Sequence, residues 1–225
     1  MNALRAAWAI AAKDLRIEWR SRTAILTASL FAILVELIIV FGRDAGTVSY
    51  AMLAPSVLWI TIALSSLVAL NRAFLLEREH GALEGILAAP VNRSALFWGK
   101  WFANLVFVLA VVTVAFPLWV LFFNVEPSTG LYGVMGLAVL GAIGFTAVGT
   151  VFSAMTVRTR HAELLLPVLM LPFMLPPVFF AAQATMRLLG GRPMEELWGW
   201  LRLLALFDVV FLVLATLIFP AVVDE

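Results

Sequence analysis

The chain consists of long apolar stretches separated by short polar segments. Six windows of about 20 residues or more carry almost no charge. They span residues 23–42, 48–70, 95–123, 131–157, 164–186 and 197–223. A segment that crosses a bilayer must satisfy its backbone hydrogen bonds internally, and these windows lack the alternating pattern of a barrel strand. Each window is therefore predicted to be a transmembrane helix.

The amino-acid composition also indicates that the chain is a membrane protein. Of 225 residues, 64% are hydrophobic and 13% are charged, and the mean hydropathy is +1.05. Charged residues make up about 25% of an ordinary water-soluble domain. We expect an all-α integral membrane protein in which residues 23–225 form a six-helix transmembrane domain, with no room for a separate soluble domain. The absence of cysteine excludes disulfides and thiolate metal sites.

Basic residues predict the orientation of the spans. One set of span ends is flanked by eleven lysines and arginines: Arg5, Lys13, Arg16, Arg20, Arg22, Arg72, Arg78, Arg93, Lys100, Arg158 and Arg160. The other set has only four: Arg43, Arg187, Arg192 and Arg202. Short cytoplasmic loops carry the excess of positive charge, so both termini are expected to be cytoplasmic.

Residues 1–22 are predicted to form an amphipathic helix in the inner headgroup layer. At about 100° per residue, its basic residues cluster within roughly a quarter turn, beside an apolar arc. The basic group is Arg5, Lys13, Arg16 and Arg20, and the apolar arc is Leu4, Trp8, Ala11, Leu15 and Trp19. No short apolar core ends at a small-residue cleavage site, so we expect the segment to be retained. It is either a plain anchor or a lever that connects membrane motion to a cytoplasmic partner.

Two acidic residues lie inside predicted spans, Glu36 and Asp208. An ionised side chain there costs about 2.5–3.5 kcal/mol on insertion scales. At ~1.5 Å per residue, Glu36 lies roughly 9 Å from the outer end of its span and Asp208 roughly 12 Å from Trp200, so both are expected in the outer leaflet. We expect both to face a protein interior or an aqueous cavity. The alternative is two separate structural hydrogen bonds, or neutral acids.

Two spans carry signals for helix packing. Small residues recur at every fourth position of the fourth span and allow another backbone to approach: Ala138, Ala142, Thr146 and Thr150. Four prolines remove amide donors from the fifth span, which is expected to be kinked or interrupted: Pro167, Pro172, Pro176 and Pro177. Met170 and Met174 share a face of that span, where core packing is favoured over haem ligation.

Known catalytic and nucleotide-binding motifs do not occur in the sequence. The one Gly-Lys pair, Gly99-Lys100, has Ser94 where a P-loop needs its first glycine and Trp101 where it needs serine or threonine. His80 and His161 are 81 residues apart, which excludes a histidine metal cluster at helical spacing. No hydrolase or metalloprotease spacing is present. The basic loops follow from membrane topology and do not indicate nucleic acid. The chain is not expected to be an enzyme, so any energy must come from a partner.

The loop at 71–94 is unusually rich in charged residues and glycine. Residues 82–88, "ALEGILA", would form a short helix with Leu83, Ile86 and Leu87 on one face and Glu84 on another. Pro90 would end it, and Asn92 or Ser94 would cap the third span. Seven residues that include a glycine should not hold a helix alone in water. We therefore expect this segment to dock against a partner.

The motif ERE-x-G-x-L-E-x-(L/I)-L-x-x-P-(V/L)-x-R, at residues 77–93, resembles the coupling helix of ABC-2-type, type V exporter-like permeases. Together with "LAPSVLWITIALSSLVALNRAF" at 53–74 and "LLLPVLMLPFMLPPVFFAA" at 164–182, it is similar to the CcmB family of cytochrome c maturation. The resemblance covers most of the chain and is weaker at the C-terminus. It places these residues in contact with an ATPase: Glu77, Glu79, Gly81, Leu83, Glu84, Ile86, Leu87, Pro90 and Arg93. Asn71 stands where some relatives have an acidic residue.

The resemblance also implies partners and a location. A CcmB-type permease pairs with itself and with two copies of the ATPase CcmA, works beside CcmC and CcmD, and serves the haem chaperone CcmE, in the bacterial inner membrane. ATP would be bound by the ATPase and haem handled by a neighbour, with no cofactor on this chain. The external stretch "LWGWLRLLALFD" at 197–208 has no histidine beside it, which favours a mechanical subunit over a haem carrier.

Two alternatives remain: an ABC-2 exporter of a lipid, polysaccharide or drug, and a stand-alone channel or secondary transporter with Glu36 and Asp208 as its ion path.

Overall fold

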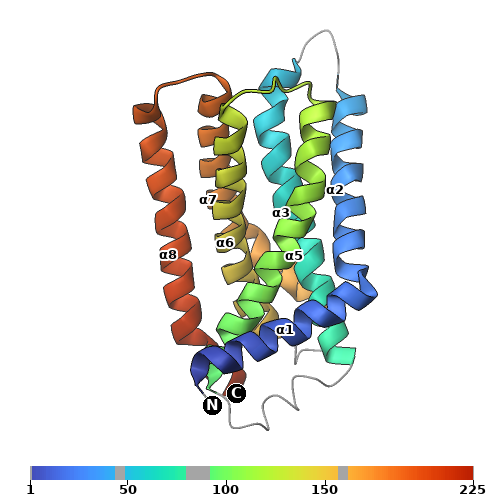
Figure 1. Ribbon diagram of the computed structural model, residues 1–225, viewed down its shortest axis with the longest axis vertical. Helices are drawn as coiled ribbons and strands as arrows, with labels where there is room; N and C mark the ends of the chain where they lie inside the picture. The colour runs from blue at the N-terminus through green and yellow to red at the C-terminus, as the bar shows by residue number, and fades with distance from the viewer. Residues whose placement is uncertain (1, 44–48, 80–91, 157–161, 225) are drawn as a thin grey trace.

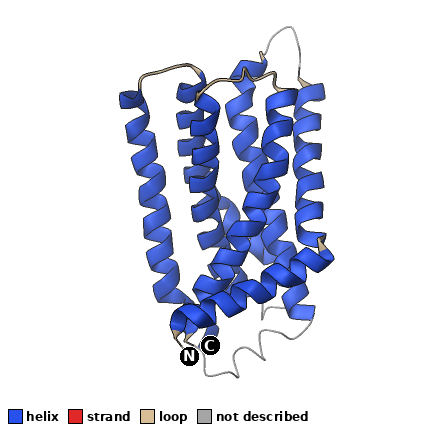
Figure 2. Cartoon of the chain, viewed as in Figure 1, coloured by secondary structure: helices blue, strands red, loops and turns tan. Residues whose placement is uncertain are grey.

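The protein is all-helical in the computed structural model (Figures 1 and 2). The structure describes residues 2–43, 49–79, 92–156 and 162–224, and of these it describes the backbone alone at 72–79, 162–163 and 224. In these ranges there are seven helices and no strand. The helices are α1 (Ala3–Ser21), α2 (Thr23–Gly42), α3 (Tyr50–Glu79), α5 (Arg93–Phe122), α6 (Gly130–Thr156), α7 (Ala162–Leu189) and α8 (Met194–Asp224).

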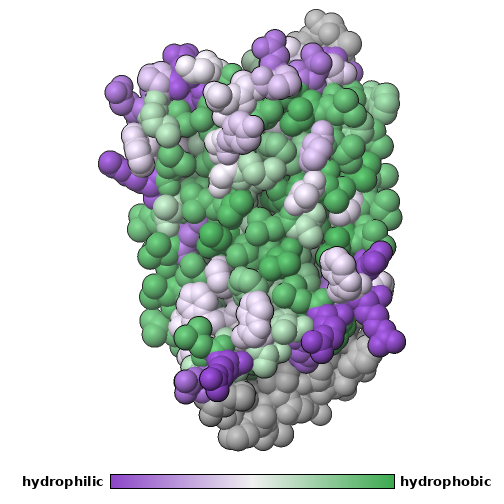
Figure 3. Space-filling model, viewed as in Figure 1, coloured by the Kyte–Doolittle hydropathy of each residue, from purple (hydrophilic) through white to green (hydrophobic). Residues whose placement is uncertain are grey.

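The six helices from α2 to α8 are each long and apolar enough to cross a membrane, which confirms the predicted spans. They stand side by side as a bundle, and α1 lies across one end, where the last turn of α8 also lies (Figure 1). Figure 3 shows a broad hydrophobic band between two hydrophilic ends. After the second predicted span, the residues FLLERE (74–79) are expected to continue the helix, and α3 does continue nine residues beyond Leu70 to Glu79. This extension brings Glu77 and Glu79 into a helix.

The core of the bundle lies around α3 and α6, the two helices with the largest buried share. All four predicted small residues of α6 are fully buried: Ala138, Ala142, Thr146 and Thr150. On the same helix, a Cβ atom at Gly141 would lie 2.6 Å from the ring of Trp59 on α3. The indole N–H of Trp59 also donates to Oγ1 of Thr185 on α7, at 2.8 Å. The expected close packing around α6 is therefore confirmed.

The proline-rich fifth span, α7, is continuous from Ala162 to Leu189, so the expectation of an interrupted helix is wrong. Each proline removes only one amide donor, and the packed neighbours α3, α6 and α8 hold the helix in place. A kink stays a prediction. Met170 and Met174 are both buried in the main core cluster, as the packing interpretation expects.

Candidate coupling site at the α1 end of the bundle

The predicted coupling segment is flanked by two described helices. α3 ends at Glu79 and α5 begins at Arg93, both at the end of the bundle that α1 crosses (Figure 1). Asn92 caps α5, since its Oδ1 accepts a hydrogen bond from the Ser94 amide at 2.9 Å. This confirms one of the two predicted caps. Arg93 itself is half-buried in the first turn.

The centre of the predicted coupling helix lies outside the described residues. This applies to Gly81, Leu83, Glu84, Ile86, Leu87 and Pro90. Glu77 and Glu79 lie in the last turns of α3, where only the backbone is described. The role of these residues in coupling therefore stays a prediction.

Next to this segment, α1 crosses α5 in very close contact at Gly99. A Cβ atom at Gly99 would lie 2.6 Å from the carbonyl oxygen of Ala7 and 2.9 Å from Cβ of Ile10. Nearby, the rings of Trp8 and Phe102 lie 5.9 Å apart. Gly99 therefore provides the space that lets α1 pack on α5.

A buried ion pair ties the same two helices together. Nζ of Lys100 on α5 lies 3.8 Å from Oδ2 of Asp14 on α1, and the Lys100 side chain is only 4% exposed. The other carboxylate oxygen of Asp14 is 2.5 Å from Nζ of Lys13. A buried lysine is costly unless it is paired, and the carboxylate of Asp14 offsets part of this cost for Lys100. The Gly99-Lys100 pair is thus a helix-packing element.

The joint between α1 and α2 is fixed by a side chain that caps the second helix. Arg22 takes a left-handed conformation, with φ of 56°, and forms the turn between the helices. The buried carboxylate of Glu18 accepts a hydrogen bond from the Ile25 amide at 2.9 Å, within the first turn of α2. A carboxylate at a helix N-terminus satisfies a free amide and also stabilises the helix dipole. This joint, residues 18–25, connects α1 to α2 as one unit.

One apolar cluster contains a residue of α1 and residues of three spanning helices. Ile10 packs in one cluster with residues of α5, α6 and α8: Leu96, Phe97, Ala154, Ala215, Phe219 and Val223. On its other sides, α1 leaves Leu4, Trp8 and Trp19 more than half exposed. The helix is confirmed at 3–21, and its exposed aromatic and aliphatic side chains are consistent with the predicted headgroup position. α1 therefore packs on α5 and α2, and Ile10 shares an apolar cluster with residues of α6 and α8.

The two intramembrane acids are buried, as expected, but they lie on different sides of the bundle. Glu36 is 0% exposed and Asp208 is 4% exposed. In the described part of the chain, none of their carboxylate oxygens has a hydrogen-bond partner. Glu36 is on α2, which packs on α1, α3 and α5, whereas Asp208 is on α8, which packs on α5, α6 and α7. Oδ1 of Asp208 contacts α6 at Gly144, where a Cβ atom would overlap with it. The structure does not bring the two acids into one site.

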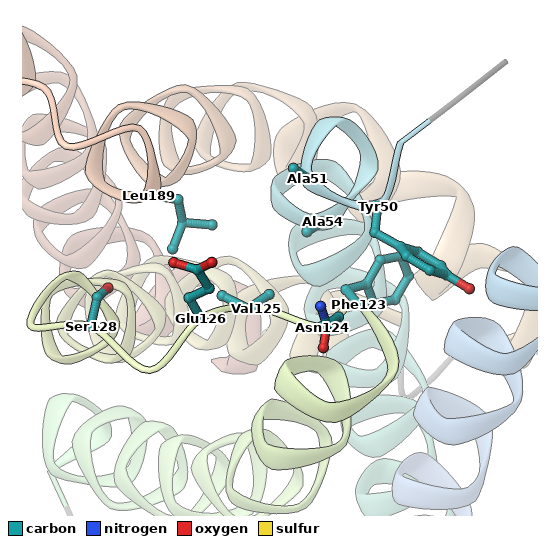
Figure 4. A pocket seen from close by; sticks show the side chains of 9 residues that line it. All are labelled: Tyr50, Ala51, Ala54, Phe123, Asn124, Val125, Glu126, Ser128 and Leu189. Atoms are coloured by element: carbon teal, nitrogen blue, oxygen red, sulfur yellow. The ribbon is translucent and has the colours of Figure 1, made fainter. Parts of the chain in front are cut away.

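A pocket of about 360 Å³ opens at the end of the bundle opposite α1 (Figures 1 and 4). It is lined by Tyr50, Ala51, Ala54, Phe123, Asn124, Val125, Glu126, Ser128 and Leu189. The Glu126 carboxylate points towards Leu189, and the rings of Tyr50 and Phe123 meet edge to face on the other side. The guanidinium of Arg43 lies 3.5 Å from the centre of the Tyr50 ring. The pocket contains none of the residues that the sequence pattern singled out.

A protein-family comparison covers almost the whole chain. The family model described as CcmB protein matches residues 5–225. The chain belongs to the CcmB family. The match includes α8, although the C-terminal part carries the weaker resemblance in the sequence motifs.

Among curated proteins, relatives of this CcmB-family chain are named heme exporter protein B. The protein from Rhodobacter capsulatus is 28% identical over 187 residues, which cover 83% of this chain and 85% of that protein. The protein from Paracoccus denitrificans is 29% identical over 192 residues, covering 84% and 87%. The protein from Escherichia coli K12 is 26% identical over 178 residues, covering 79% and 80%. The chain is thus a multi-pass membrane protein of a permease family.

Three residues of the α1 contact, Asp14, Glu18 and Lys100, were not identified as site residues from the sequence. The signals were present but weak. Lys100 falls inside the third apolar window, where a lysine needs an acidic partner. Asp14 and Glu18 are the two acids of the otherwise basic N-terminal segment. The spacing of these acids did not reveal that one would pair with α5 and the other would cap α2.

Proposed function

We propose that this CcmB-family chain is the membrane permease subunit of an ABC transporter for cytochrome c maturation. In this role it transmits ATP-driven motion from a CcmA-type ATPase to the delivery or release of haem by its neighbours. The family match and the name of its relatives, heme exporter protein B, support the system. The observation that carries the mechanical role is the attachment of α1 to α5 by Gly99 and the Asp14–Lys100 pair.

The contacts at the α1 end provide a route by which a displacement of the segment at 80–91 would be transmitted to other helices of the bundle. That segment of the chain follows α3 and precedes α5. α5 is tied to α1 through Lys100, and α1 is tied to α2 through Glu18. The cluster around Ile10 adds α6 and α8. A displacement of α5 would therefore move α1 and α2 with it, because breaking the buried ion pair is costly.

The loop residues take specific roles in this proposal. Leu83, Ile86 and Leu87 form the apolar face that enters a groove of the ATPase, and Gly81 and Pro90 set the two ends of the short helix. Polar contacts with the ATPase come from Glu77, Glu79, Glu84 and Arg93.

The remaining features of the proposal concern the assembly. The α1 end faces the cytoplasm of a bacterium, with both termini there, and the chain lies in the inner membrane. Two copies of this chain pair with two copies of the ATPase, beside CcmC- and CcmD-like proteins, and the complex serves the haem chaperone CcmE. ATP is hydrolysed in the ATPase subunit, and haem is held by a neighbour. The separation of Glu36 and Asp208 on α2 and α8 argues against the alternative of a channel built on both acids.

Co-purification with the cognate ATPase tests the coupling role. We expect Leu83→Asp and Gly81→Pro to lose the ATPase, since one places a charge on the docking face and the other changes the entry to the helix. Leu83→Met is the matched control, because it keeps an apolar side chain of similar volume. If Leu83→Asp retains the ATPase as well as Leu83→Met does, the coupling role is refuted.

A further inference from the structure

The pocket at the end of the bundle opposite α1 has a buried side and an exposed side (Figure 4). On the buried side, Ala54 is 0% exposed, and its carbonyl oxygen accepts a hydrogen bond from the indole of Trp119 at 2.8 Å. On the exposed side lie Asn124, Glu126 and Ser128. The volume, about 360 Å³, is within the range of small-molecule sites, which is about 300–1,000 Å³. The pocket is therefore large enough for a small ligand and open on one side.

The exposed side of the pocket lies outside the spanning helices. Residues 123–128 lie between α5, which ends at Phe122, and α6, which begins at Gly130. The other lining residues come from the first turns of α3 and from Leu189, the last residue of α7. The pocket thus opens at a hydrophilic end of the bundle, beyond the hydrophobic band (Figure 3).

Backbone contacts hold the exposed side in one shape. Asn124 takes a left-handed conformation, with φ of 49°, which asparagine adopts more readily than most residues. The next amide, that of Val125, donates to the carbonyl oxygen of Val120 at 3.0 Å. A Cβ atom at Gly130 would lie 3.2 Å from the carbonyl oxygen of Leu188, so this glycine lets the start of α6 approach the end of α7. The wall of the pocket is therefore preformed.

Glu126 is the one charged residue among the described residues that line the pocket. Within the described ranges, its carboxylate takes part in no salt bridge. Arg43 and Arg187, at the same end of the bundle, have other contacts. The guanidinium of Arg43 lies 3.5 Å from the centre of the Tyr50 ring. That of Arg187 donates to Oε1 of Gln183 at 2.8 Å. The pocket therefore presents a negative charge to a ligand.

We propose that the pocket is a binding site for an aliphatic ammonium group, the chemistry of a lysine side chain and of a free alkylamine. The carboxylate of Glu126 points towards the side chain of Leu189 (Figure 4). An ammonium that pairs with Glu126 would have its hydrocarbon stem against Leu189, as lysine stems lie on apolar surfaces in proteins. Asn124 and Ser128 add acceptor oxygens to the lining, and an ammonium has three donors and no acceptor. The site does not depend on the proposed ATPase partner.

Protection of an engineered cysteine tests this site in the purified full chain in lipid nanodiscs. The chain has no native cysteine, so Ser128→Cys places a single thiol in the pocket. Pentylamine should slow the reaction of this thiol with the neutral reagent N-ethylmaleimide severalfold, whereas pentanol and pentanoate should not. Adding Glu126→Gln should abolish the protection, and both substituted residues are exposed, so the chain should still fold. Met194→Cys is the control thiol, because it is exposed on α8 and does not line the pocket.

A second arm distinguishes the two sources of the ammonium group. A short peptide with blocked ends and one lysine should protect Ser128→Cys at lower concentration than pentylamine if the pocket receives a protein segment. Weaker protection by the peptide would indicate a free amine, and either result supports the ammonium site. The proposal is overturned if neither amine protects the thiol at millimolar concentration, or if pentanol or pentanoate protects it equally. It is also overturned if the protection persists in Glu126→Gln or is the same at Met194→Cys.

Discussion

Asp14 on α1 and Lys100 on α5 form an ion pair that is unequally buried, because the lysine side chain is 4% exposed and the aspartate side chain 19%. Asp14 has a second cationic neighbour in Lys13, whose Nζ is 2.5 Å away. The two ends of the pair should therefore respond differently to mutation. Removal of the aspartate leaves a buried lysine without this partner, whereas removal of the lysine leaves an aspartate that keeps Lys13.

The first prediction follows from this asymmetry. Asp14→Asn should lower the free energy of unfolding by about 3–5 kcal/mol, the usual cost of breaking a buried pair, and Lys100→Met should lower it by less. The double variant Asp14→Asn/Lys100→Met should be more stable than Asp14→Asn alone, because it also removes the buried positive charge. Thermal unfolding of the three variants in detergent measures these differences. Equal losses for both single variants would contradict the asymmetry.

A second prediction concerns the close approach at Gly99. Gly99→Ala should displace α1 from α5, since its Cβ atom would lie 2.6 Å from a backbone oxygen that cannot move independently. The chain has no native cysteine, so one engineered pair can report the distance between the helices. Cysteines at positions 8 and 102, where Trp8 contacts Phe102, should cross-link readily in the parent chain and much less with Gly99→Ala.

The matched control for this experiment is Gly136→Ala. Gly136 is also a helical glycine, but a Cβ atom there would meet nothing within 4 Å. Cross-linking between positions 8 and 102 should therefore be unchanged. If Gly99→Ala cross-links as fast as Gly136→Ala, α1 tolerates the extra atom and the close contact is not essential.

The third prediction distinguishes two effects of Glu18 on α2: the hydrogen bond that its side chain accepts and the interaction of its charge with the helix dipole. Glu18→Ala should cost about 1 kcal/mol, since the Ile25 amide loses its acceptor. Glu18→Gln keeps an acceptor oxygen and should lose only the smaller interaction with the helix dipole, about 0.3–1 kcal/mol. Hydrogen exchange at the Ile25 amide should rise in Glu18→Ala and stay close to wild type in Glu18→Gln. Similar exchange in both variants would mean that the side chain is not the cap.

Much of the fold could be predicted because it depends on properties that lie along one helix. Each span is a continuous apolar window, and burial of Glu36 and Asp208 follows from the cost of charge in the membrane. The contacts between helices could not be predicted in the same way. Lys100 was counted among the basic residues that set the orientation, and its pairing with Asp14 depends on where α1 crosses α5. That crossing point depends on the three-dimensional arrangement of the helices, and no sequence period determines it.

The continuity of α7 is a second feature that could not be predicted from the sequence of one helix. Four prolines favour a kink or an interruption when the helix is considered alone, yet α7 is not interrupted at any of them. Packing against three neighbours outweighs the missing amide donors, and the order of helices in the bundle decides which neighbours these are. The candidate loop at 80–91 is the opposite case. Its motif is local, so the sequence could identify it, but it lies outside the described residues and its role stays a prediction.

The last prediction uses the contact between Gly144 and Asp208. Gly144→Ala should destabilise the bundle, because the new Cβ atom would overlap with Oδ1 of Asp208 and approach the Phe207 ring to 3.1 Å. The loss should be about 1–3 kcal/mol, as for other overpacked cores, and Gly136→Ala is again the control. Adding Asp208→Ala should restore part of the lost stability, since the shorter side chain removes the overlap. Thermal unfolding of Gly144→Ala, Asp208→Ala and the double variant measures the coupling between the two positions. Strictly additive effects would show that Asp208 can turn away from α6, and that its buried position does not depend on Gly144.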